Sequence, residues 1–213
     1  MGEAKITAIL LNYKREQNLR EILQALGETG LVPEVIVWNN NPATRLRGGA
    51  AVKVINAAHN FKAYARYAAA FLAANDLILF QDDDLVLRPD DLAALHRQLT
   101  DDPGRICGIA GRNLTDGAYS QEPAFGEVDI VLGRFMLFSK QLLASVYGEM
   151  LKLTPIERGD DIAFSLLTGV KHIAPRTPWK ELDGADEHAL WRHSDHYTKR
   201  QMMVDRVIAL KAT

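Results

Sequence analysis

The feature that most constrains the fold is a set of short apolar, strand-forming segments that each run into a polar cluster. They are ITAILL at Ile6–Leu11, VIVW within Glu34–Trp38 and LILF within Asp76–Gln81. Strands that are apolar at successive positions are buried on both faces, as in parallel sheets covered by helices on each side. Leucine and isoleucine recur at helical spacing between Leu19 and Leu26, which predicts one such helix. We therefore predict an α/β fold with a mainly parallel central sheet flanked by helices.

The rest of the chain continues this alternation. Further strands are predicted at Ala51–Ile55, Ile106–Ala110, Asp129–Leu132 and Arg134–Ser139. Further helices are predicted at Phe61–Ala74, Leu92–Leu99, Lys140–Lys152, Asp161–Thr168 and Ser194–Leu210, the last with Ser194 as its N-cap. The segments Arg112–Gly126 and Pro175–Leu190 are interpreted as loops. No linker divides the sequence, so residues 1–213 are interpreted as one domain.

The composition narrows the range of partners. Of the 213 residues, 24% are charged and the formal net charge is −2, so the chain lacks the basic excess of a nucleic-acid-binding protein. The single cysteine, Cys107, excludes an intrachain disulfide, and its apolar neighbours indicate a small buried side chain. No apolar run approaches the ~18 residues of a transmembrane helix, and the N-terminus lacks the layout of a signal peptide. We expect a cytoplasmic protein with a small-molecule ligand.

Polar clusters follow the predicted strands at Asn12–Glu16, Asn39–Asn41 and Asp82–Asp84. The carboxyl ends of parallel strands meet at one edge of a sheet, where such folds bind ligands, so we expect these clusters to converge. In an extended chain, Asp82 and Asp84 face one side and Asp83 the other. Two converging carboxylates make a hard, oxygen-rich site that suits Mg²⁺ or Mn²⁺ together with phosphate oxygens. The simpler alternative is a solvated acidic turn before a helix that begins near Asp90.

Two other features stand out. Arg66 is a cation within an otherwise apolar or small-residue helical segment, which a long side chain reaching for water would also explain. Asp160 and Asp161 are adjacent carboxylates at the start of a predicted helix. Acidic residues there also satisfy free N–H groups and suit the helix dipole, so a purely structural role is an alternative to a catalytic one.

The ordered set of motifs resembles the GT-A fold of nucleotide-sugar glycosyltransferases, in which a DxD motif ends a central strand and holds a divalent metal. Within that class the sequence is most similar to the exostosin-type transferases, glycosyltransferase family 64. The matching motifs lie between Ile6 and Ile173 and are ITAILLNYKRE, VIVWNNN, LFQDDDLVL, GRFMLFSK and ERGDDIAFSLL. The resemblance implies a metal-dependent enzyme that moves an N-acetylhexosamine or hexose from a UDP-sugar to a glycan or glycolipid acceptor, with retention of configuration.

The resemblance also implies roles for the matching residues. On the nucleotide-sugar side these are Tyr13, Arg15, Asn39, Asn40, Asn60, Arg66, Asp82 and Asp83. Asp84 is the first choice as ligand of Mn²⁺ or Mg²⁺, with Asp82 beside it. Asp161, and next Asp160, is the candidate catalytic or acceptor-orienting carboxylate. Residues 1–84 would then form a nucleotide-binding half and residues 85–213 an acceptor-binding half.

Further candidates come from the later part of the chain. His193 and His196 at the start of the last predicted helix are candidate metal ligands, and Arg200 a candidate for the diphosphate. A solvated basic helix face would look the same. Arg134 and Trp179 are candidates for the acceptor side, because an aromatic ring stacks well on a sugar face.

Two other functions remain open. A sugar-nucleotide nucleotidyltransferase has a similar sheet but usually carries a glycine-rich loop after its first strand, whereas this chain has Asn12-Tyr13-Lys14-Arg15. A GT-A-like domain that only binds a glycan would tolerate loss of either acidic pair, and both are present. Without a membrane anchor or disulfides, the chain departs from luminal animal members of family 64. A cytoplasmic microbial enzyme that reaches the membrane through a partner fits these features better.

Overall fold

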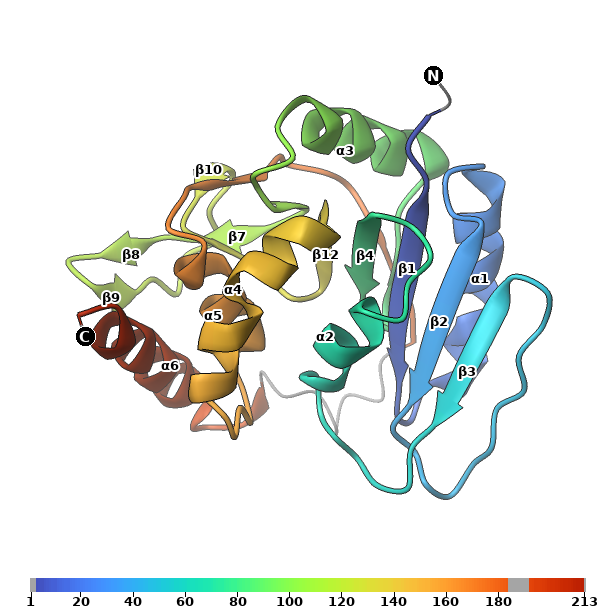
Figure 1. Ribbon diagram of the computed structural model, residues 1–213, viewed down its shortest axis with the longest axis horizontal. Helices are drawn as coiled ribbons and strands as arrows, with labels where there is room; N and C mark the ends of the chain where they lie inside the picture. Colours follow the sequence, from blue (N-terminus) through green and yellow to red (C-terminus); the bar gives the residue numbers. More distant parts are fainter. Residues whose placement is uncertain (1–2, 184–191, 213) are drawn as a thin grey trace.

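The computed structural model of the chain describes residues 3–183 and 192–212 (Figure 1). Its centre is an eight-stranded sheet in the order β10-β13-β6-β12-β4-β1-β2-β3. In chain order these strands are β1 (Ile6–Asn12), β2 (Glu34–Asn39), β3 (Val52–Asn56), β4 (Leu77–Gln81), β6 (Cys107–Gly108), β10 (Gly126–Val128), β12 (Phe135–Ser139) and β13 (His172–Ala174). The helices are α1 (Leu19–Glu28), α2 (Ala65–Ala70), α3 (Pro89–Asp101), α4 (Lys140–Lys152), α5 (Asp160–Leu167) and α6 (His196–Lys211), with a 3-10 turn η1 at Glu16–Asn18.

Three pairs of short strands lie outside this sheet. They are β5 (Leu85–Val86) with β14 (Lys180–Glu181), β7 (Gly111–Arg112) with β11 (Ile130–Val131), and β8 (Leu114–Thr115) with β9 (Ala118–Tyr119). All three pairs are antiparallel. The first pair matters most for the site, because β5 begins directly after the three aspartates.

The strand order reverses at the centre of the sheet. The strands β1, β2, β3 and β4 run parallel, with β2 and β3 on one side of β1 and β4 on the other. The strand β12 is antiparallel to both β4 and β6, and β13 is parallel to β6. In such sheets ligands bind outside the carboxyl ends of the strands, at the point where the order reverses. The sheet therefore confirms the predicted α/β architecture and places a ligand edge after β1 and β4.

Both faces of the sheet are covered, which explains why its strands are apolar at successive positions. Ile6, Ala8 and Leu10 of β1 belong to one buried cluster, together with the apolar residues of α1 and α3. Ile9 of β1 and Phe80 of β4 belong to a second cluster on the opposite face, with residues of α2, α4, α5 and α6 (Figure 1). Burial on both sides is what the continuous apolar runs predict.

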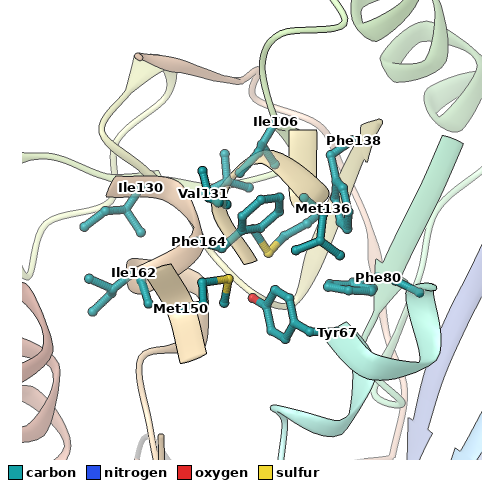
Figure 2. Packing of buried hydrophobic residues seen from close by; sticks show 14 of the residues in the cluster. Tyr67, Phe80, Ile106, Ile130, Val131, Met136, Phe138, Met150, Ile162 and Phe164 are labelled. Atoms are coloured by element: carbon teal, nitrogen blue, oxygen red, sulfur yellow. The ribbon is translucent and has the colours of Figure 1, made fainter. Parts of the chain in front are cut away.

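Four aromatic rings of the second cluster, those of Tyr67, Phe80, Phe138 and Phe164, contact one another in series (Figure 2). The ring centroid of Phe80 in β4 lies 5.0 Å from that of Tyr67 in α2 and 4.8 Å from that of Phe138 in β12. The ring centroids of Phe138 and of Phe164 in α5 are 4.8 Å apart. All three contacts are edge-to-face, a favoured arrangement for aromatic pairs. Because Arg66 precedes Tyr67 and Asp161 stands three residues before Phe164, this packing fixes the positions of both charged side chains.

Several element boundaries differ from the prediction. The helix expected at Phe61–Ala74 spans only Ala65–Ala70. Lys62 has a φ of 61°, which is not a helical conformation, so the helix begins after it. Ser194 is not the N-cap of α6; the helix begins at His196 after Asp195, whose side chain makes no capping bond. The segment interpreted as loop between Arg112 and Gly126 contains the β8–β9 hairpin. Nowhere in residues 3–183 or 192–212 is a helix long and apolar enough to cross a membrane.

Two buried side chains bear on the predictions. Cys107 is expected to be buried, whereas His172 lies in a strand that is not predicted. Cys107 is 1% exposed in β6, and burial raises the pKa of its thiol to about 12, as expected for a small buried residue. His172 in the unpredicted strand β13 is wholly buried. Its Nδ1 accepts the N–H of Ile106 (3.1 Å), and its Nε2 lies 3.0 Å from the carbonyl oxygen of Ser165. Desolvation by burial lowers the pKa of His172 to about 4.

This pKa predicts a pH dependence of stability. Because the folded-state pKa of His172 lies below the unfolded value of 6.5, protonation favours unfolding. The contribution of neutral His172 to the free energy of unfolding is complete above pH 6.5. It is lost as the pH falls from 6.5 to 4, by roughly 3 kcal/mol in all. Urea unfolding of the wild type and of His172→Gln should show a stability difference that shrinks over this range. The exposed His59→Gln serves as the control, and a pH-independent difference for His172→Gln would contradict the assignment.

Candidate functional site

Three asparagines end the three neighbouring parallel strands in register. Asn12 pairs with Asn39, and Asn39 with Asn56. The side-chain amide of Asn12 donates to the side-chain oxygen of Asn39 (2.8 Å), and the side-chain amide of Asn39 donates to the side-chain oxygen of Asn56 (3.0 Å). Asn39 also donates to the backbone oxygen of Thr44 (2.8 Å). Asn39, predicted to contact the nucleotide, is wholly buried, and its side chain holds the following loop in place.

Asn40 and Asn60 shape the segment before α2. The side chain of Asn40 accepts the N–H of Phe61 (3.0 Å) and donates to the oxygen of Lys62 (3.2 Å). Asn60 accepts the N–H of Lys62 (2.7 Å). Together these bonds stabilise the positive φ of Lys62 and so fix where α2, with Arg66, begins.

An open cavity of about 220 Å³ lies between the segment after β1 and the loop after β2. It is lined by Tyr13, Lys14, Glu16, Gln17, Asn41 and Thr44. The ammonium group of Lys14 lies 5.2 Å from the centre of the Tyr13 ring. The linked side chains of Asn12, Asn39 and Asn56, here called the asparagine ladder, hold one wall of this cavity through the bond from Asn39 to Thr44. Of the predicted nucleotide-binding residues, Tyr13 is the one that lines it.

The three aspartates Asp82–Asp84, here called the acidic turn, follow β4 at the reversal point of the sheet. The strand ends at Gln81, whose amide donates to the oxygen of Leu85 (2.8 Å) and closes the turn. Asn18 donates to the oxygen of Asp83 (2.8 Å). Because the chain turns instead of staying extended, the expected alternation does not apply. Asp83 and Asp84 share Arg15, and Asp82 lies toward Arg66.

Three arginines surround the acidic turn. Arg15 Nη1 lies 2.7 Å from Asp83 and 3.3 Å from Asp84, which also receives a hydrogen bond from Arg134 Nη2 (3.1 Å). Asp82 has the weakest pairing, with Arg66 Nη1 at 3.4 Å. Desolvation by burial, together with the neighbouring carboxylates of Asp84 and Asp83, raises the pKa of Asp82 to about 7 against the opposing effect of Arg66. Two of the three arginines also serve other carboxylates, Arg66 that of Asp160 and Arg134 that of Glu181, so the three aspartates are not matched one for one.

This turn fits a divalent cation by its chemistry. Mg²⁺ and Mn²⁺ prefer carboxylate oxygens and are commonly held by one or two carboxylates plus substrate phosphates. Among residues 3–183 and 192–212, no three or more His, Cys, Asp or Glu side chains gather in a way that could hold a metal ion. The predicted set of Asp82, Asp84, His193 and His196 is thus not assembled, and the ligand role of the two histidines stays a prediction. His193 is exposed, and His196 is the first residue of α6.

Asp160 and Asp161, here called the carboxylate pair, are joined to the acidic turn by one side chain. Arg66 Nη2 lies 2.5 Å from Asp160, and Arg66 Nη1 donates to the oxygen of Gly133 (2.7 Å) as well as facing Asp82. Arg66 and the carboxylate pair are each less than 10% exposed. Two acidic motifs that are 78 positions apart, from Asp82 to Asp160, thereby meet at one buried guanidinium.

Asp161 has its own set of donors. Its Oδ2 accepts from Arg200 Nη2 (2.9 Å) and from the N–H of Gly133 (3.0 Å), and its Oδ1 accepts from the N–H of Ile162 (3.0 Å). Burial opposes ionisation of this carboxyl, but Arg200 and the backbone donors outweigh it and lower its pKa. Arg200, predicted to meet the diphosphate, is buried and lies 4.8 Å above the Tyr119 ring.

The predicted acceptor residues lie beside the acidic turn. Arg134 forms a fork with Glu181 (2.7 and 3.0 Å), and the Trp179 indole donates to Glu181 (2.7 Å). The strand β14 pairs with β5 and brings Glu181 opposite Leu85. Sequence reasoning missed Glu181, because β14 lies in a segment with two prolines and no periodic pattern. The part of the predicted loop from residue 184 to 190 lies outside the described residues.

A sheet with its ligand edge at the reversal point, and an acidic turn at that edge, is the arrangement expected of a GT-A fold. Residues 7–151 match the sequence model of Glycosyl transferase family 2, and the chain belongs to this family. The GT-A fold and the glycosyltransferase class are confirmed, whereas nothing supports the narrower resemblance to family 64.

Among solved structures, the chain is similar to "Mannosyltransferase PcManGT from Pyrobaculum calidifontis in complex with GDP-Man and Mn2+". The TM-score is 0.58 at 18% sequence identity, and the match covers 82% of this chain and 55% of that chain. The chain thus spans about half the length of that mannosyltransferase. Among curated proteins, none matches this sequence.

The pairing of Asp161 with Arg200 predicts a large effect on stability. Asp161→Ala leaves a buried guanidinium without its carboxylate, which should cost about 3–5 kcal/mol of unfolding free energy in urea titrations. Asp161→Leu combined with Arg200→Met should recover most of this loss, since it removes both charges. Asp195→Ala is the control and should change stability much less, because the Asp195 side chain, which pairs with Arg158 and Lys199, is 47% exposed. Equal losses for Asp161→Ala and Asp195→Ala would show that the buried pair contributes nothing special.

Proposed function

We propose that the chain transfers an N-acetylhexosamine or hexose from a UDP-sugar to a hydroxyl group of a glycan or glycolipid acceptor, with Mn²⁺ or Mg²⁺ as cofactor. The observation that carries this proposal is the link through Arg66, which joins the acidic turn at the end of β4 to the carboxylate pair at the start of α5. A donor diphosphate at the turn would then hold its sugar next to Asp160 and Asp161. Membership of a glycosyltransferase family supports the reaction class.

The donor is proposed to bind from the cavity at Tyr13 to the acidic turn. Arg15 connects the two, since it lies two residues after Tyr13 in the chain and contacts Asp83. The similar mannosyltransferase is described as a complex with GDP-Man and Mn²⁺, which supports a sugar nucleotide and a divalent metal. It also makes GDP-mannose the donor to test beside UDP-sugars.

Asp84 and Asp82 are the proposed metal ligands. When bound, a divalent cation would stabilise the leaving diphosphate as a Lewis acid. Arg15 and Arg134 orient the carboxylates of the acidic turn before donor binding, through the contacts at 3.3 Å or less. His193, His196 and Arg200 stay proposed partners of the metal and diphosphate from the start of α6.

The transfer breaks the bond between the sugar C1 and the diphosphate oxygen, which leaves with the electron pair. The acceptor oxygen bonds to C1 and gives up its proton. The expectation of retention rests on the resemblance to family 64 alone. In a retaining course the leaving phosphate can take the proton, whereas inversion requires Asp161 to take it. Asp161 already accepts three hydrogen bonds, one of them from Arg200. It would therefore act as a base only after its ion pair with Arg200 breaks. The anomeric configuration of the product, read by NMR, decides between the two.

The two predicted halves keep distinct proposed roles within one domain. Residues 1–84 supply the cavity and the acidic turn, and residues 85–213 supply the carboxylate pair and the proposed acceptor residues Arg134 and Trp179. The Arg134 guanidinium lies 5.8 Å from the Trp179 ring centre, so both stand at the same edge of the acidic turn. This arrangement supports an acceptor site next to the donor sugar.

Metal-dependent nucleotide binding is the first test. Mn²⁺ with UDP or GDP, at about 100 times the Kd, should stabilise the protein by about 2.7 kcal/mol and raise Tm by roughly 5–10 °C. EDTA should abolish the shift, as should Asp84→Ala, because it removes the first-choice metal ligand. Asp205→Ala, on the exposed side of α6, is the control and should keep the shift. An unchanged shift in Asp84→Ala would reject the role of the acidic turn.

Turnover is the second test. UDP-N-acetylhexosamines, UDP-hexoses and GDP-mannose are incubated with Mn²⁺, and release of the nucleoside diphosphate is measured with and without candidate acceptors. We expect release from one donor class, lost in EDTA and reduced at least about 100-fold in Asp84→Ala. Nucleotide binding without turnover of any donor would favour a domain that only binds. Formation of a sugar nucleotide from a sugar phosphate and a nucleoside triphosphate would favour the nucleotidyltransferase.

A further inference from the structure

The turn between β11 and β12 contacts both acidic motifs through its backbone. The oxygen of Arg134 accepts the N–H of Asp82 (2.9 Å), and the oxygen of Gly133 accepts Arg66 Nη1 (2.7 Å). The N–H of Gly133 donates to Asp161 Oδ2 (3.0 Å). Through its backbone, Gly133 therefore contacts both Arg66, which faces the acidic turn, and Asp161 of the carboxylate pair.

Space, and not backbone conformation, is what requires glycine here. The φ of Gly133 is outside the left-handed region that favours glycine. A Cβ at this position would lie 2.4 Å from Arg66 Nη2 and 3.4 Å from Asp161 Cβ. The first distance is far inside the ~3.5 Å of a comfortable contact, so Arg66 would have to move.

Arg66 has little room to move. Its side chain is 4% exposed, and its guanidinium carbon lies 5.1 Å from the Phe80 ring centre and 5.7 Å from the Tyr67 ring centre. Both rings belong to the aromatic cluster that anchors α2 and α5. A methyl group on Gly133 would therefore displace the guanidinium from Asp160, Asp82 or both.

We propose that Gly133 is a positioning residue: its missing side chain lets Arg66 hold Asp82 and Asp160 at once, which couples the donor side of the site to the carboxylate pair. This inference rests on the proposed function, since the coupling matters only if the acidic turn binds the donor. Gly133 acts through Arg66 and touches no substrate. Its effect should therefore appear in kcat more than in KM for the donor.

A double-mutant cycle tests this. The variants are Gly133→Ala, Arg66→Lys, the combination of both, and Gly148→Ala in α4 as the matched control, where a Cβ meets nothing within 4 Å. Lysine keeps the charge of Arg66 but lacks the second nitrogen that the new carbon would meet. The measurements are Tm without ligand, and kcat and KM with UDP-N-acetylglucosamine and with GDP-mannose, each with Mn²⁺.

In the wild-type background, Gly133→Ala should lower kcat about 10-fold or more and lower Tm. In the Arg66→Lys background the same change should alter kcat less than about 3-fold, because the contact is already gone. Gly148→Ala should leave kcat within about 2-fold, as expected for a surface change away from the site.

Three results would overturn the proposal: additive effects of Gly133→Ala and Arg66→Lys, a loss of Tm with unchanged kcat, or an equal loss in Gly148→Ala. If Gly133→Ala does not fold, restored folding in the double variant supports the Arg66 contact, and no restoration contradicts it. A wild type that turns over neither these two donors nor a UDP-hexose would instead count against the proposed function. The ligand-free Tm cycle then still decides whether Gly133 acts on Arg66.

Discussion

The site depends on the burial of one charge, the guanidinium of Arg66. A buried guanidinium is tolerated only where acceptors surround it, and here these come from three separate segments: Asp82 after β4, Gly133 before β12 and Asp160 at the start of α5. Each acceptor is held by different packing, so the contacts of both terminal nitrogens of Arg66 form only when all three segments have assembled. Burial of the Arg66 charge costs free energy unless all three acceptors are in place. This requirement fixes the two acidic motifs in one geometry.

The topology of the sheet explains why Arg15 reaches the acidic turn. Since β1 and β4 are parallel neighbours, the residues that follow them leave the sheet at the same edge, and Arg15 meets Asp83 across 68 positions of sequence. The strands β2 and β3 extend the sheet to the other side, where the asparagine ladder holds the cavity wall. The reversal point thus separates a neutral, amide-rich region from an acidic one. A nucleotide sugar has the matching order of groups, with the base and ribose first and the diphosphate next.

The sequence predicted the parts of this arrangement that depend on local pattern. Apolar runs located the central strands, and the helix α4 was predicted with its observed ends because its boundaries have clear local signals. What could not be predicted depends on partners far away in the sequence. Nothing near Asn39 indicates that Asn12 and Asn56 will bind its side chain, and nothing near Gly133 indicates that Arg66 will lie against it. The short strands β13 and β14 exist only through pairing with β6, β10 and β5, so they have no pattern of their own.

The balance of charge connects this structure to the proposed metal. Among the described residues, six carboxylates face four guanidinium groups at the site; they are Asp82, Asp83, Asp84, Asp160, Asp161 and Glu181, against Arg15, Arg66, Arg134 and Arg200. The carboxylate pair is matched by Arg66 and Arg200, so the excess falls on the acidic turn and Glu181. There, desolvation by burial, together with the neighbouring carboxylates, raises the pKa of Asp82. A nearby cation would favour the ionised form of Asp82 and so lower this pKa. In the part of the chain that the structure describes, the unmatched negative charge therefore lies at the acidic turn and Glu181, not at the carboxylate pair. This asymmetry is why we propose that the metal and diphosphate bind at the acidic turn and that the sugar lies toward Asp160 and Asp161.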